Sequence, residues 1–146
     1  MNILFACAGN TCRSVMAQHM LAEKLRLSGK TGQEVRSCGL LVEPYGLVHE
    51  HAVAVLRERG LDAAGHVPSP AEAHADWADL VLLMTQRQKL QWLERFPSCA
   101  GRVFTLGEFA RVSGDIRDPW GGSLDDYRAV ADMIERALDL ILPKID

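Results

Sequence analysis

The chain has 146 residues and a mass of 16.1 kDa, which is the size of one domain. Hydrophobic residues make up 48% of it and charged residues 24%, a balance that excludes extensive disorder. With 16 basic and 19 acidic side chains the net charge is −3, so there is no bulk positive field to hold nucleic acid or an anionic membrane. An anionic ligand would therefore need a local binding site.

The four cysteines are too few and too irregularly spaced for a disulfide scaffold. The first residues lack the basic and apolar segments of a signal peptide. No apolar run approaches the roughly 20 residues that span a bilayer. We therefore expect a cytoplasmic protein that has no membrane partner and keeps its cysteines as thiols.

Strand patterns and helical patterns alternate along the chain. In chain order, we predict a strand at 2–6, a helix from 14 to the glycine at 29, a strand at 34–38, a helix at 48–59, a strand at 79–85, a helix at 86–96, a strand at 102–106 and a helix after Ser123. The continuous apolar run at 80–84 is typical of a buried parallel strand. The alternation predicts an α/β fold: a single domain over 1–146, with a doubly wound, four-stranded parallel sheet and helices on both faces.

The loop after the first strand is the place to look for a ligand, because ligands of such sheets lie beyond the carboxyl ends of strands. Residues 7–14 read Cys-Ala-Gly-Asn-Thr-Cys-Arg-Ser. Gly9 and Asn10 tolerate the left-handed backbone that turns successive N–H groups inward. The following helix directs its positive end to the same point, and the planar guanidinium of Arg13 can bind two phosphate oxygens. This pattern predicts a phosphate-binding loop.

The same features favour the thiolate form of Cys7, and Ser14 can donate a hydrogen bond to it. A thiolate beneath a bound phosphoryl group is placed for in-line attack on phosphorus. The leaving group then needs a proton donor, for which Asp118 is the candidate and Asp115 the rival. The alternative is a buried cysteine in an ordinary strand–helix turn, a surface arginine, and a simple Asp-Pro turn at 118.

The 7–14 loop, combined with Asp118, Pro119 and an aromatic residue far downstream, resembles the low-molecular-weight protein tyrosine phosphatase family. The likeness covers nearly the whole chain, and the segments at 35–39 and 78–85 also match. Within the family, the chain is most similar to the bacterial protein arginine phosphatases. Thr11 stands where tyrosine phosphatases usually carry isoleucine, and Trp-Gly-Gly follows Pro119 where eukaryotic members carry a tyrosine pair.

The resemblance implies a phosphatase that works through a phosphocysteine intermediate without a metal or other cofactor. Cys7 would be the nucleophile, Arg13 would bind phosphate, and Asp118 would act first as acid and then as base. The remaining implied residues are Ala8, Gly9, Asn10, Thr11, Cys12 and Ser14 in the loop, Leu41 and Trp120 in the pocket walls, and Ser37 and His66 as supports that hold Asn10 in a strained conformation.

Thr11 bears on the substrate. It is smaller than isoleucine and carries a hydroxyl group, which favours phosphoarginine in proteins over phosphotyrosine. One rim residue shifts selectivity by only a few kcal/mol, so phosphotyrosine stays the alternative. An arsenate reductase on the same scaffold is less favoured, because Cys38 and Cys99 form no closely spaced relay pair. A phosphate-binding module without catalysis is a further alternative. The presence of Cys7, Arg13 and Asp118 together argues against it.

Three further expectations concern other residues and partners. Cys12 is either a redox partner that forms a reversible disulfide with Cys7 or a packing residue. His49, His51 and His74 are expected on the surface or in packing roles. The partners are expected to be phosphorylated proteins, with no nucleic acid and no membrane, and the protein itself a monomer or weak dimer.

Overall fold

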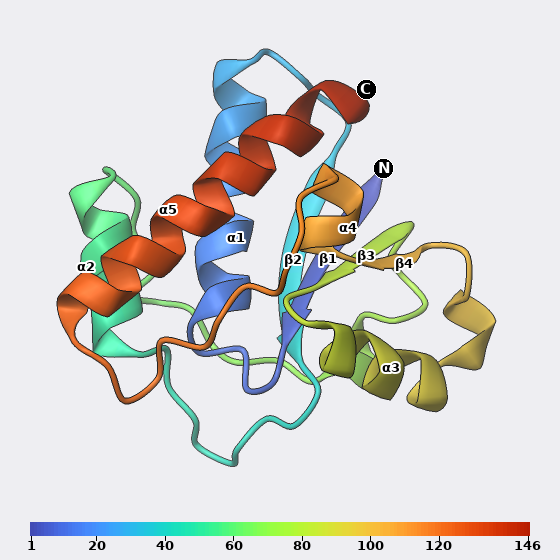
Figure 1. Ribbon diagram of the computed structural model, residues 1–146, viewed down its shortest axis with the longest axis horizontal. Coiled ribbons are helices and arrows are strands. Elements are labelled where there is room, and N and C mark those ends of the chain that lie inside the picture. Colours follow the sequence, from blue (N-terminus) through green and yellow to red (C-terminus); the bar gives the residue numbers. More distant parts are fainter.

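The computed structural model describes residues 1–146 and contains a sheet of four parallel strands (Figure 1). The strands are β1 (Asn2–Cys7), β2 (Glu34–Gly39), β3 (Leu80–Leu83) and β4 (Val103–Thr105), in the order β2-β1-β3-β4. The predicted doubly wound parallel sheet is therefore confirmed. β1 runs through the middle, and its residues from Ile3 to Ala6 have no exposed surface, which explains why it is apolar on both faces.

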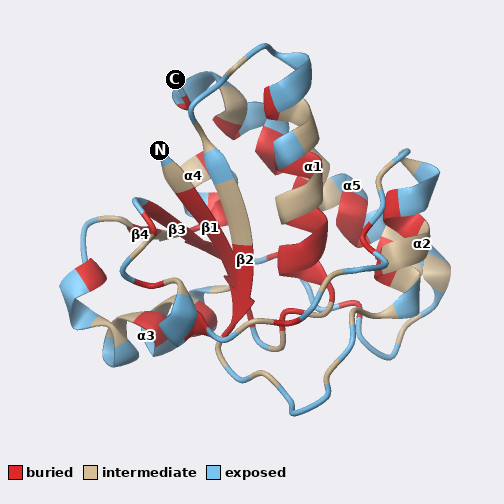
Figure 2. Ribbon diagram, turned by 180° about the vertical axis from the view of Figure 1, so that it is seen from behind, coloured by how far each residue is buried: buried red, intermediate tan, exposed pale blue.

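Helices cover both faces of this sheet (Figures 1 and 2). One face carries α1 (Arg13–Leu27), α2 (Glu50–Glu58), α4 (Leu106–Ala110) and α5 (Leu124–Ile141), and the other carries α3 (Gln86–Arg95). Ile3 and Phe5 of β1 face the larger core under α1 and α5, whereas Leu4 and Ala6 face the smaller core with Trp92 of α3. None of the helices is long and apolar enough to cross a membrane.

Caps set the start of several helices. Ser123 caps α5 as expected, and its hydroxyl accepts a hydrogen bond from the N–H of Asp126. α4 was not predicted, although Thr105 and Glu108 form the same reciprocal capping box at its start. α2 begins at residue 50, two residues later than predicted, because the Nδ1 of His49 accepts from the backbone of residue 51 and makes His49 the cap.

The carboxyl end of β1 is where the loops converge. The segment 40–49, which follows β2, is hydrogen-bonded to the loop after β1: the N–H of Leu41 donates to the carbonyl of Ala8 at 2.8 Å, and that of His49 to the carbonyl of Thr11 at 2.9 Å. Gly39 allows this close approach, since a Cβ there would lie 2.9 Å from the Ala8 carbonyl oxygen. The two loops are thus built as one unit.

Candidate active site

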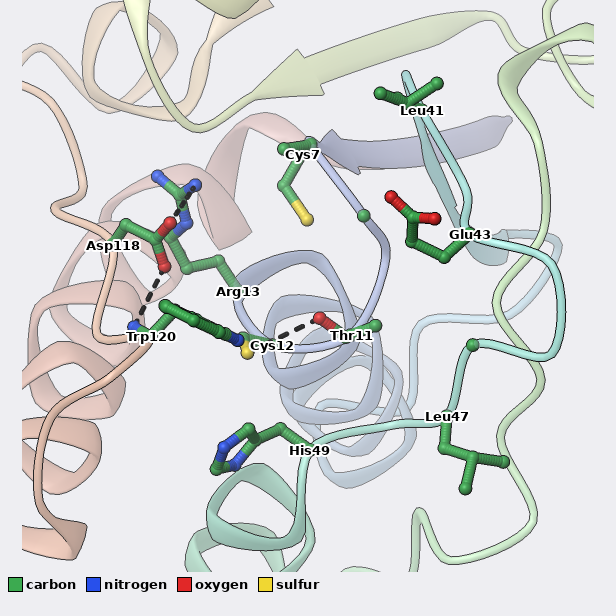
Figure 3. A pocket seen from close by; sticks show the side chains of 13 residues that line it. Cys7, Thr11, Cys12, Arg13, Leu41, Glu43, Leu47, His49, Asp118 and Trp120 are labelled. Atoms are coloured by element: carbon green, nitrogen blue, oxygen red, sulfur yellow. Dashed lines mark hydrogen bonds and ion pairs between the residues drawn. The ribbon is translucent and has the colours of Figure 1, made fainter.

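A pocket of about 440 Å³ opens at this edge of the sheet (Figure 3). Three segments far apart in the sequence form it: the loop after β1, the 40–49 segment, and the segment between α4 and α5. The lining residues are Cys7, Ala8, Gly9, Thr11, Cys12, Arg13, Leu41, Glu43, Gly46, Leu47, His49, Asp118 and Trp120. Of the residues implied for the site, only Asn10, Ser14, Ser37 and His66 do not line the pocket.

Cys7 lies at the inner end of the pocket and is 3% exposed. Its Sγ is 2.9 Å from the hydroxyl oxygen of Ser14. That oxygen also accepts a hydrogen bond from the side-chain amide of Asn10 at 2.8 Å, so the Ser14 hydrogen is directed to the sulfur. α1 begins at Arg13 and points its N-terminal end at the same place. Both features stabilise a negative charge on sulfur.

Asn10 lies behind the pocket, fully buried, with a left-handed φ of 57°. Its Oδ1 accepts from the N–H of Ser69 at 3.0 Å, which fixes the orientation of the amide. The Nδ2 group donates to Ser14 at 2.8 Å and to Ser37 at 2.9 Å. The Nε2 of His66 lies 3.1 Å from Oδ1 and 3.2 Å from the Asn10 carbonyl oxygen; both are acceptors, so this nitrogen carries the hydrogen.

Arg13 is 5% exposed and directed by two contacts. One Nη donates to the carbonyl of Ile116 at 2.8 Å, and the other lies 3.7 Å from Oδ2 of Asp118. The Asp118 side chain is 55% exposed, and its Oδ1 accepts from the N–H of Trp120 at 3.0 Å. The rival Asp115 does not line the pocket, because its carboxylate accepts from the first backbone N–H of α3. Of the two candidate proton donors, only Asp118 lines the pocket.

Cys12 differs from Cys7 in its surroundings. Both are free thiols, but the Sγ of Cys12 lies 3.4 Å from the hydroxyl of Tyr127. Burial raises the pKa of Cys12 and also that of Tyr127, so both stay protonated at neutral pH. Cys38 and Cys99 are buried elsewhere and do not line the pocket. No group of three or more His, Cys, Asp or Glu side chains is arranged to hold a metal ion.

The pocket also contains residues that the sequence did not assign to it: Glu43, Gly46, Leu47 and His49. His49 does pack, since its ring stacks on Tyr127 with centroids 4.8 Å apart, but it lines the pocket as well. The predicted helix at 48–59 includes His49, and nothing in the sequence indicates a pocket position for it. Leu41 is 75% exposed and Trp120 72%, so the rim offers apolar surface to a substrate.

The family model described as low molecular weight phosphotyrosine protein phosphatase matches residues 2–146. The chain belongs to this family. It is therefore a cysteine-dependent protein phosphatase, and the pocket at the end of β1 is its candidate active site.

Several phosphatases are similar to it. A protein-arginine-phosphatase of Geobacillus stearothermophilus is 40% identical over 144 residues, covering 98% of this chain and 95% of that protein. A probable low molecular weight protein-tyrosine-phosphatase, EpsP, of Ralstonia nicotianae is 34% identical over 98% of this chain and 94% of its own. A solved structure of the YwlE arginine phosphatase, an active-site mutant with a phosphorylated serine, is 37% identical with a TM-score of 0.92, covering 99% and 95% of the two chains.

Replacing Asn10 tests whether its side chain shapes the loop after β1. Asn10→Ala leaves several buried partners without hydrogen bonds while retaining a Cβ at positive φ. We expect a loss of about 3 kcal/mol in the free energy of unfolding and about 100-fold slower turnover of p-nitrophenyl phosphate. Asn10→Gly relieves the strain only, so it should recover part of the stability but little activity. Wild-type turnover in Asn10→Ala would contradict a shaping role for the amide.

His66 should make stability depend on pH. Burial lowers the pKa of His66 from the ordinary 6.5. The neutral imidazole is therefore favoured more in the folded protein than in the unfolded chain. Its contribution is complete above about pH 6.5 and is lost as the pH falls through the lower pKa of the folded state. Burial acts in the same direction on His19 and His74.

We therefore expect the melting temperature to fall between about pH 7 and about pH 5. The variant His66→Gln, which keeps a hydrogen-bond donor but does not titrate, should show a shallower decline, with His51→Gln as the control. A decline of equal steepness in His66→Gln and wild type would show that His66 does not couple to folding.

Proposed function

We propose that residues 1–146 form a phosphatase domain that hydrolyses phosphoarginine in proteins through a phosphocysteine intermediate. The observation that carries the mechanism is the position of the Cys7 sulfur, at the inner end of the pocket, beside the Ser14 hydroxyl and the N-terminal end of α1. The substrate assignment is supported by Thr11, which lines the pocket, and by the similarity to a protein-arginine-phosphatase.

In the first step, the backbone N–H groups of the 7–13 loop and Arg13 bind the phosphoryl oxygens. The Cys7 thiolate forms a bond to phosphorus while the bond from phosphorus to the leaving nitrogen breaks. Asp118, at the mouth of the pocket, gives its proton to that nitrogen. The products of this step are free arginine in the protein substrate and phosphocysteine.

In the second step, water attacks the phosphocysteine and the Asp118 carboxylate takes up its proton. The sulfur–phosphorus bond breaks, inorganic phosphate leaves and the Cys7 thiolate is restored. Ser14 stabilises that thiolate as the leaving group, because its hydrogen points at the sulfur. The cycle consumes one water molecule and needs no oxidant or reductant.

The setting follows from this chemistry. The enzyme would act on phosphorylated proteins as a monomer or weak dimer, without nucleic acid. A reducing compartment such as the cytoplasm would preserve the Cys7 thiolate, which oxidation would disable. Activity requires reducing conditions whether Cys12 forms a protective disulfide with Cys7 or only packs against Tyr127.

Phosphotyrosine remains the second candidate substrate, supported by the similarity to the probable tyrosine phosphatase EpsP. The two candidates share the mechanism and differ only in the leaving group. Thr11 is the residue on which they diverge: an isoleucine would fill the space beside the leaving group with apolar atoms, whereas the threonine leaves room and offers a hydroxyl.

Two substitutions test the mechanism. Cys7→Ser should abolish turnover of p-nitrophenyl phosphate, because a serine hydroxyl is a far weaker nucleophile than a thiolate. Asp118→Asn should slow turnover of a phosphoarginine peptide by about 100-fold, because it removes the proton donor. Asp115→Asn is the matched control and should retain most activity. Full activity in Cys7→Ser, or an equal loss in both aspartate variants, would refute the assigned roles.

A paired assay tests the substrate. We expect kcat/KM to be at least about tenfold higher for a phosphoarginine peptide than for the matching phosphotyrosine peptide. Thr11→Ile should lower the ratio of the phosphoarginine value to the phosphotyrosine value, by an amount that corresponds to a few kcal/mol or less in free energy. Thr11→Val separates the loss of the hydroxyl group from the added bulk. A wild-type preference for phosphotyrosine would replace the first candidate with the second.

A further inference from the structure

Two acidic side chains line the pocket from opposite sides. Asp118 comes from the segment before α5, and Glu43 from the 40–49 segment after β2. In Figure 3 they lie on opposite sides of Cys7, and the Glu43 side chain is directed from its own loop toward the loop that carries Cys7 and Thr11. Asp118 has a place in the mechanism, whereas Glu43 has none so far.

The Glu43 carboxylate has no partner in the protein. It forms no ion pair and no side-chain hydrogen bond, unlike Asp118, which contacts Arg13 and the backbone of Trp120. The imidazole of His49, which also lines the pocket, makes no ion pair with Glu43, and its Nδ1 accepts a hydrogen bond from the backbone N–H of residue 51. Both carboxylate oxygens of Glu43 are thus free to accept hydrogen bonds from a ligand in the pocket.

The backbone of Glu43 is held by a turn while its side chain is free. Its carbonyl accepts a hydrogen bond from the N–H of Gly46 at 3.0 Å, and Tyr45 adopts a left-handed φ of 63° in the same turn. At one end of the 40–49 segment, Leu41 is hydrogen-bonded to the phosphate-binding loop, and at the other end so is His49. The Glu43 carboxylate is therefore presented from a segment that is fixed relative to Cys7.

The order of charges along the pocket suits one class of leaving group. The Arg13 side chain is 6% exposed and starts at the N-terminal end of α1, whereas Glu43, the acidic side chain not used as proton donor, is exposed. A phosphorylated arginine presents its charges in the same order, with an anionic phosphoryl group followed by a cationic guanidinium that has several N–H donors. A phosphorylated tyrosine has a neutral ring in that position.

We propose that Glu43 is a specificity-determining residue that accepts hydrogen bonds from the guanidinium of phosphoarginine, across the pocket from Asp118. This inference rests on the proposed function and deepens it. A guanidinium and a carboxylate form charge-assisted hydrogen bonds with planar geometry, which a phenyl ring cannot supply. The contact adds discrimination in the binding of the leaving group, while Cys7 and Asp118 perform the bond changes.

The test measures kcat/KM of Glu43→Gln on matched phosphoarginine and phosphotyrosine peptides. The substitution keeps the shape of the side chain and removes its charge. We expect the ratio of the phosphoarginine value to the phosphotyrosine value to fall about tenfold, mainly through KM for phosphoarginine. Added NaCl should lower the wild-type ratio but not the ratio of the variant. Glu50→Gln is the matched control, since Glu50 is exposed and directly follows the 40–49 segment in the chain but does not line the pocket.

The outcomes separate this inference from the proposed function. If the wild type prefers phosphotyrosine, the proposed substrate is wrong. If the wild type prefers phosphoarginine and Glu43→Gln keeps the same ratio, the role of Glu43 is wrong and the function stands. A thermal melt of Glu43→Gln that matches the wild type shows that the variant is folded. If Glu50→Gln lowers the ratio as much as Glu43→Gln, the effect comes from long-range charge and the direct contact is refuted.

Discussion

The left-handed conformation of Asn10 is the constraint on which the rest of the site depends. A non-glycine residue at positive φ costs roughly 1 kcal/mol or more, and the buried amide of Asn10 offsets this through hydrogen bonds. Its partners belong to α1, β2 and the segment that precedes η1 (Ala71–Ala73): Ser14, Ser37, His66 and Ser69. The loop after β1 therefore takes its shape only when α1, β2 and the segment before η1 are assembled around Asn10.

That dependence explains what the sequence could predict. The strands, the main helices and the 7–14 loop have local signals, because apolar periodicity and the junction of a strand with a helix lie within contiguous residues. The pocket positions of Glu43 and His49 have no such signal. They follow from backbone hydrogen bonds between the 40–49 segment and the loop after β1, which join residues about 30 or more apart in the chain. The helix α4 did have a local signal, the capping box at 105–108.

The same assembly makes two neighbouring cysteines chemically different. Cys7 ends a strand, faces the N-terminal end of α1 and receives a hydrogen bond from Ser14. Cys12 lies at the helix boundary but turns toward Tyr127 in the larger core, where burial raises its pKa. The Cys7 sulfur thus has a hydrogen-bond donor and a helix N-terminal end beside it, whereas burial keeps Cys12, five positions later, a thiol. Proximity in sequence does not determine reactivity here.

The side chains that line the pocket cannot account for anion binding by charge alone. Arg13 contributes one positive charge, whereas the Glu43 carboxylate and a Cys7 thiolate contribute two negative charges, and Asp118 is neutral while it holds the proton for the leaving group. In the proposed mechanism the backbone N–H groups of the loop and the N-terminal end of α1 supply the remaining attraction for the phosphoryl group, and they act at short range despite the net charge of −3. The Glu43 carboxylate repels a phosphoryl group that arrives alone, and a cation attached to the same substrate reverses this contribution. With the role proposed for Glu43, the pocket selects for the order of charges within the substrate rather than for its total charge.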